Sequence, residues 1–160
     1  MSKANQSLTT LGSALELAVW LEKHGQAFYE NARRDRLAPE LDTLFTWLAE
    51  DEKKHGQIYT RLFEDCTGQA IGETAPLGEY GLFIELMRKE VSRHLTIEPG
   101  LSPLDLLDRA LQFEKDTLLY FHEIGALFPS DQRTPIDAIC AEERQHVRQL
   151  LALRHQLADA

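Results

Sequence analysis

The hexads EDEKKH, residues 50–55, and AEERQH, residues 141–146, each place a glutamate three positions ahead of a histidine. On an α-helix this spacing puts both side chains on the same face. Each hexad interrupts a long stripe of apolar residues at helical spacing, and the stripe continues on both sides of it. The two Glu-x-x-His pairs are therefore expected to lie on buried helix faces.

Four long segments of the chain have the periodicity of amphipathic helices, whereas sustained strand patterns are almost absent. The predicted helices span about residues 11–36, 39–66 and 102–128, and a last helix follows Ser130 and Asp131 and reaches about residue 157. The loops within the first pair and within the second pair are short. The stretch 67–101 is much longer and contains a short helical run near its end. We therefore expect one all-α domain over residues 1–160, a four-helix bundle with a long crossover containing a short extra helix.

The other two long helices each carry one glutamate midway along the apolar stripe, Glu22 and Glu114. A buried ionised carboxylate is costly unless it is paired or bound to a metal. Four glutamates carry four negative charges, which two divalent cations would balance, and these donors suit iron, manganese or zinc. The predicted metal ligands are Glu22, Glu52, His55, Glu114, Glu143 and His146.

The two halves of the chain repeat one motif. Glu114 follows Glu22 by 92 positions, and Glu143 follows Glu52 by 91. The segments LEKHGQAFYE and FEKDTLLYFH also align, with Glu-Lys in register. A duplication of this kind predicts two halves related by a pseudo-twofold axis that meet at one central site.

This constellation resembles the ferritin-like diiron-carboxylate superfamily, most closely its rubrerythrin-like branch, through LEKHGQAFYE, LAEDEKKH, LQFEKDTLLYF and CAEERQH. The resemblance covers about residues 11–153. It implies two iron ions per chain at the six ligands, with zinc or manganese as substitutes. It also implies an oxidoreductase of ferroxidase or peroxidase type that reacts with O2 or hydrogen peroxide. A non-catalytic iron-binding or storage protein and a bundle with structural zinc or manganese are the alternatives.

The chain departs from the family pattern in three ways. Thr117 stands where rubrerythrins commonly have a further glutamate, and the CxxC motifs of an appended rubredoxin domain are missing, so we expect a separate electron donor. Residues 158–160 leave no room for the short fifth helix of ferritin cages. Together with Trp20 and Trp47, which we expect on the surface, this predicts a homodimer rather than a cage.

Two pairs of polar residues accompany the predicted ligands. Tyr29 and Tyr59 lie one heptad beyond a ligand glutamate, where a phenol could hydrogen-bond a carboxylate and where an ordinary core tyrosine would fit equally well. Asp51 and Glu142 directly precede ligand glutamates. Because consecutive residues are about 100° apart around a helix, these two are expected to face solvent or the bundle edge.

Composition excludes several kinds of partner. The net charge of -9 argues against nucleic acid or an anionic membrane surface, which require clustered Lys and Arg. The N-terminal residues lack the apolar core of a signal peptide, and no apolar run is long enough to span a membrane. Cys66 and Cys140 form no CxxC motif. We therefore expect a cytoplasmic protein.

Overall fold

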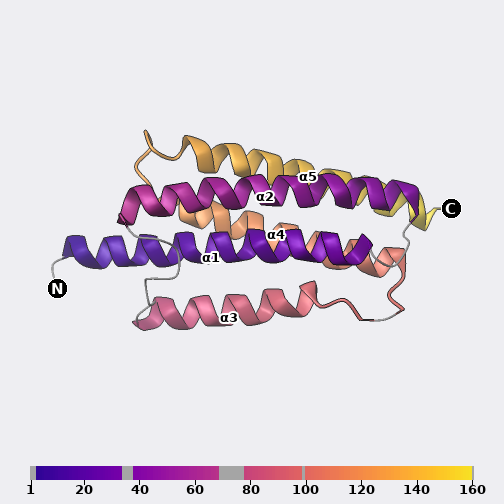
Figure 1. Cartoon of the computed structure of the whole chain (residues 1–160), viewed down its shortest axis with the longest axis horizontal. Coiled ribbons are helices and arrows are strands. Elements are labelled where there is room, and N and C mark those ends of the chain that lie inside the picture. Colours follow the sequence, from indigo (N-terminus) through magenta and orange to yellow (C-terminus); the bar gives the residue numbers. More distant parts are fainter. Residues whose placement is uncertain (1–2, 34–37, 69–77, 99, 160) are drawn as a thin grey trace.

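The computed structural model describes residues 3–33, 38–68, 78–98 and 100–159, and no strand occurs among them. The helices are α1 (Lys3–Ala32), α2 (Pro39–Thr67), α3 (Gly78–Leu95), α4 (Pro103–Leu127) and α5 (Thr134–Ala158). Helices α1, α2, α4 and α5 run side by side, and α3 lies against α1 and α4 on the outside of this bundle (Figure 1). The predicted all-α bundle with an extra helix in its crossover is confirmed.

Two helix starts agree with the sequence, one at a proline in the first turn and one at a capping box. Helix α2 begins at Pro39, as predicted. Helix α4 begins behind a capping box, in which the Ser102 hydroxyl accepts from the Asp105 N–H and the Asp105 carboxylate accepts from the Ser102 N–H. These hydrogen bonds satisfy backbone donors that the first turn of a helix leaves free.

The predicted start of α1 is wrong, whereas α5 follows Ser130 and Asp131 as predicted. Helix α1 begins at Lys3. The segment 3–10 is helical although it is largely polar, so the apolar periodicity did not indicate it. Helix α5 begins at Thr134, since Ser130 and Asp131 lie in a turn that the Gln132 N–H closes on the Pro129 carbonyl. The predicted extension of α1 to residue 36 lies largely outside the described residues.

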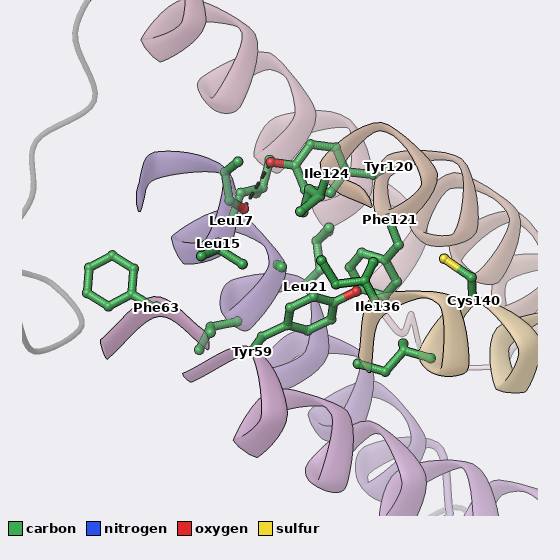
Figure 2. Close-up of a cluster of buried hydrophobic side chains, with 14 of the residues drawn as sticks. Leu15, Leu17, Leu21, Tyr59, Phe63, Tyr120, Phe121, Ile124, Ile136 and Cys140 are labelled. Carbon is green, nitrogen blue, oxygen red and sulfur yellow. Dashed lines mark hydrogen bonds between the residues drawn. The ribbon is translucent and has the colours of Figure 1, made fainter. Parts of the chain in front are cut away.

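Apolar side chains fill the bundle on both sides of its middle. One cluster includes Leu15, Leu21, Tyr59, Phe121 and Ile136 (Figure 2). The other includes Phe28, Leu41, Phe45, Leu107 and Leu150. Along each bundle helix, the predicted ligand glutamate lies between residues of the two clusters. The polar middle of the bundle is therefore closed off from both ends.

The surface differs from expectation at the two tryptophans. Trp20 and Trp47 are partly buried, each packed against one of the apolar clusters. Among the residues whose exposure the structure describes, the exposed large apolar side chains are instead leucines, on α3 and α4: Leu82, Leu86, Leu119 and Leu127. None of the described helices combines the length and the apolar content that a membrane crossing requires.

Candidate metal centre

The six predicted ligands converge in the middle of the bundle, and all of them are fully buried. They come from all four bundle helices: Glu22 from α1, Glu52 and His55 from α2, Glu114 from α4, and Glu143 and His146 from α5. Helical spacing explains this convergence, because each Glu-x-x-His pair occupies one inward face of its helix and the single glutamates occupy the inward faces of the other two.

The six residues form two overlapping groups of four donors. The His55 position consists of Glu22, Glu52, His55 and Glu143; the His146 position consists of Glu52, Glu114, Glu143 and His146. Within each group, one donor atom of every residue lies within 4.8 Å of the others. Glu52 and Glu143 belong to both groups. The arrangement can hold two cations that share two carboxylates.

Glu143 lies between the two histidines. Its Oε1 is 2.9 Å from His55 Nδ1, and its Oε2 is 3.0 Å from His146 Nδ1. The two imidazole rings are nearly parallel, with centroids 5.7 Å apart and planes at 21°. Both histidines thus direct the same ring nitrogen, Nδ1, toward the centre of the cluster and leave Nε2 for other partners.

Most carboxylate oxygens of this cluster lack a hydrogen-bond partner in the described part of the protein. Six of these oxygens have no hydrogen-bond partner among the residues that the structure describes: both oxygens of Glu22, both of Glu52, Oε2 of Glu114 and Oε1 of Glu143. Leaving a buried polar atom unsatisfied costs about 1–3 kcal/mol, and more when it is charged. Two divalent cations would balance the charge of four glutamates and occupy these oxygens. The residues therefore fit a dimetal group.

In the metal-free protein, two of the buried glutamates favour the protonated form. Burial, together with the nearby charge of Glu52, raises the pKa of Glu22 well above its usual value. Burial and the charges of Glu52 and Glu143 likewise raise the pKa of Glu114. These carboxyl groups resist ionisation until something positive replaces the proton.

The pKa of Glu143 shifts in the opposite direction. Although burial opposes its ionisation, the imidazole rings of His146 and His55, which lie against its two carboxylate oxygens, lower the pKa of Glu143. For the histidines, burial disfavours the charged ring, but the surrounding carboxylates outweigh it. They raise the pKa of His55 to about 9 and also raise the pKa of His146. The cluster thus favours positive charge at its centre.

The two predicted tyrosines have different surroundings. The Tyr29 hydroxyl donates a hydrogen bond to Glu114 Oε1, so it can fix the orientation of that carboxylate. Tyr59 is equally buried and packs against the Phe121 ring, but its hydroxyl has no hydrogen-bond partner among the described residues.

Asp51 and Glu142 contact the outer nitrogens of the two histidines, which the sequence did not lead us to expect. Glu142 Oε2 lies 2.6 Å from His55 Nε2, and Asp51 Oδ2 lies 3.6 Å from His146 Nε2. Each acid thus reaches the histidine of the other repeat. The sequence does show an acidic residue directly before each Glu-x-x-His. Which group that acid contacts depends on how α2 packs against α5.

A groove of about 380 Å³ between α1 and α2 reaches the cluster. Its lining includes Glu52 and Gly56, and its exposed walls include the cations Lys23, Lys53 and Arg61. This groove is a route by which a small molecule can approach one of the shared carboxylates from solvent.

Close helix packing beside the cluster requires a glycine. A methyl group at Gly25 would lie 2.6 Å from carbons of the Phe113 ring and 3.0 Å from Glu52 Oε2. Both distances are shorter than ordinary contacts, so α1 can approach α4 and the Glu52 carboxylate this closely only without a side chain.

Comparison with known proteins agrees with this geometry. The rubrerythrin family model matches residues 13–154, a range that contains all six candidate ligands. A crystal structure from Thermotoga maritima, described as that of a ferritin-like diiron-carboxylate protein, matches with a TM-score of 0.66 and 21% identity. The match covers 91% of this chain and 94% of that one, and at this identity it shows a shared fold. No curated protein matches the chain significantly.

Proposed function

This chain belongs to the rubrerythrin family, and we propose that it is a diiron-carboxylate oxidoreductase that reacts with O2 or hydrogen peroxide. The observation that carries the proposal is the pair of buried four-donor groups that share Glu52 and Glu143. Two iron ions bound in these groups would supply the two electrons that reduce an O–O bond.

The protein's own residues hold and orient this centre. Glu22 and His55 would bind one ion, Glu114 and His146 the other, and the two shared glutamates both. The Tyr29 hydroxyl keeps its proton directed at Glu114 Oε1 and so limits rotation of that carboxylate. The Glu142 carboxylate, 2.6 Å from His55 Nε2, holds that ring with Nδ1 facing inward.

The surroundings favour small oxygen species as reactants. Apolar clusters close both ends of the polar middle and exclude bulk water. The groove between α1 and α2 leads to Glu52, and its exposed walls carry three cations, Lys23, Lys53 and Arg61, against one anion, Glu64. This excess of positive charge disfavours metal ions relative to neutral or anionic molecules. This groove would therefore admit the oxidant rather than the iron.

Repeated turnover needs a supply of electrons. The chain contains two cysteines, Cys66 and Cys140, which are too few for an iron site with four cysteine ligands. We therefore propose that a separate donor reduces the centre.

Anaerobic iron loading tests the proposal. Purified protein with two equivalents of Fe(II) is mixed with O2 or hydrogen peroxide, and iron oxidation is followed by near-ultraviolet absorbance. We expect rapid oxidation, and repeated peroxide consumption when reduced methyl viologen is supplied. His55→Ala should lose iron and activity, whereas His155→Ala, at an exposed residue of α5, should retain both. A single oxidation without turnover would favour an iron-binding protein, and failure to retain iron would refute the centre.

A further inference from the structure

We propose that the two metal positions are unequal: the His146 position binds the first divalent ion tightly, and the His55 position binds a second ion that exchanges readily. The inference rests on the proposed dimetal function and adds an order of loading to it. Its basis is the internal repeat, because two groups that support the His146 position, the Tyr29 hydroxyl and the Trp47 ring, have weaker counterparts at the His55 position.

The first difference concerns the carboxylate that belongs to one position alone. At the His146 position, Glu114 accepts a hydrogen bond from Tyr29. The residue 92 positions after Tyr29 is Phe121, which has no hydroxyl to offer to Glu22. Both oxygens of Glu22 accordingly lack a hydrogen-bond partner among the described residues. Glu114 is therefore held in place before a metal arrives, and Glu22 is not.

The second difference concerns the acid at each histidine Nε2. The Asp51 side chain beside His146 is only 11% exposed, and Lys54 Nζ holds it at 2.6 Å. Its counterpart beside His55 is Glu142, whose side chain is 57% exposed. The counterpart of Lys54, 91 positions later, is the neutral Gln145. Glu142 Oε2 nevertheless lies at hydrogen-bond distance, 2.6 Å from His55 Nε2, whereas Asp51 Oδ2 is 3.6 Å from His146 Nε2, too far for a hydrogen bond. The acids at Nε2 therefore do not favour the His146 position.

The third difference concerns the cover over each imidazole. The Trp47 ring lies edge-on to the His146 ring, with centroids 5.1 Å apart and planes at 83°. The residue 91 positions after Trp47 is Ala138, which is exposed and has no ring. His146 is thus shielded by an aromatic group that the repeat does not provide for His55.

The first and third differences both favour the His146 position. Removing an outer partner of a metal ligand typically lowers metal affinity about 10- to 100-fold. We therefore expect the two dissociation constants to differ by at least about 10-fold. Protein that is short of metal should accumulate with only the His146 position filled.

Titration of the full metal-free chain with Co(II) tests the inference, using calorimetry for affinity and visible absorbance for coordination. The wild type should show two separate steps. His55→Ala should retain the tight step, and His146→Ala should retain only a weak one. Circular dichroism of both variants checks that the helices are intact.

Two further substitutions test the inference without removing a ligand, because each changes only a single hydroxyl. Tyr29→Phe should weaken the tight step about 10-fold or more and leave the weak step unchanged. Phe121→Tyr, at the matching position of the repeat, should tighten the weak step.

Several results would overturn the inference. They are two equal steps in the wild type, a tight step that survives His146→Ala but not His55→Ala, or no effect of either hydroxyl exchange. Equal steps would leave the proposed function standing, because two ions would still bind. Wild-type protein that binds neither Co(II) nor Fe(II) would overturn both.

Discussion

Tyr29 and Glu114 are 85 residues apart in the sequence, yet the Tyr29 hydroxyl donates a hydrogen bond to Glu114 Oε1 in the buried middle of the bundle. This contact joins α1 to α4 and satisfies one oxygen of a carboxyl group that has no access to water. Its loss should therefore be measurable in the stability of the protein as well as in metal binding.

Tyr29→Phe should destabilise the metal-free protein by about 1–3 kcal/mol, because it leaves a buried acceptor without its donor. Tyr59→Phe is the matched control, since Tyr59 is just as buried but its hydroxyl has no hydrogen-bond partner among the described residues. Denaturant unfolding of both variants measures the difference. Equal losses in the two variants would show that the hydrogen bond to Glu114 does not stabilise the fold.

Gly25→Ala should destabilise the protein by about 1–3 kcal/mol, because its methyl group would overlap the Phe113 ring and press on Glu52. The control is Gly125→Ala in α4, where the nearest atom would be 3.4 Å from the new methyl group. That substitution should be neutral or stabilise by up to about 1 kcal/mol, through higher helix propensity. Thermal unfolding of both proteins checks this prediction, which fails if Gly25→Ala is tolerated as well as Gly125→Ala.

Thr60→Trp should slow oxidation of bound iron by O2 or peroxide, because Thr60 lines the groove that leads to Glu52. Iron stoichiometry should not change, since Thr60 is not a ligand. Ala152→Trp fills a different groove, between α2 and α5, and should leave the rate unchanged. Stopped-flow absorbance measures both rates. If both substitutions had the same effect, the groove between α1 and α2 would not be the route of the oxidant.

The metal-free protein should become less stable as pH rises from about 5 to 9. Glu22 and Glu114 have raised pKa values, so they contribute stability that is present below their unfolded pKa and is lost as pH rises through the folded one. The pKa of His55 rises from 6.5 to about 9, so its contribution is lost between these values. Glu143 has the opposite sign, but its lowered pKa affects stability only in more acidic solution.

Melting temperature against pH, measured with and without a chelator, checks this prediction. Metal-loaded protein should show the reverse trend at acidic pH, because protons displace the ions. Glu22→Gln removes a charge while keeping the shape of the side chain, and it should flatten the metal-free curve. A metal-free melting temperature that does not depend on pH would mean that the carboxylates are solvated.

The sequence was sufficient to predict the convergence of the six candidate ligands, because a spacing of three places Glu52 beside His55 on any α-helix. The contacts of Asp51 and Glu142 could not be predicted, since they depend on how two helices from different repeats pack against each other. The sequence places Tyr29 and Tyr59 alike, each one heptad beyond a glutamate, yet one meets a carboxylate and the other does not. That difference is a property of tertiary packing.

Helix starts show the same limit on a smaller scale. The capping box at Ser102 and Asp105 is a local device and could be predicted from four residues. Ser130 and Asp131 have equally suitable side chains but lie in a turn before α5. The first residues of α1 are helical without an apolar stripe, so a method based on hydrophobic periodicity does not detect them.

The most extensive helix contacts in the bundle join α1 to α2 and α4 to α5, so the chain consists of two hairpins placed face to face. Each metal position takes donors from both hairpins, and at the level of the cluster their interface is lined by carboxylates. Bound ions would therefore link the two hairpins across that interface. Without the ions, the two hairpins should separate and reclose as independent cooperative units. Amide hydrogen exchange on their inner faces should then accelerate, while each hairpin keeps its helices.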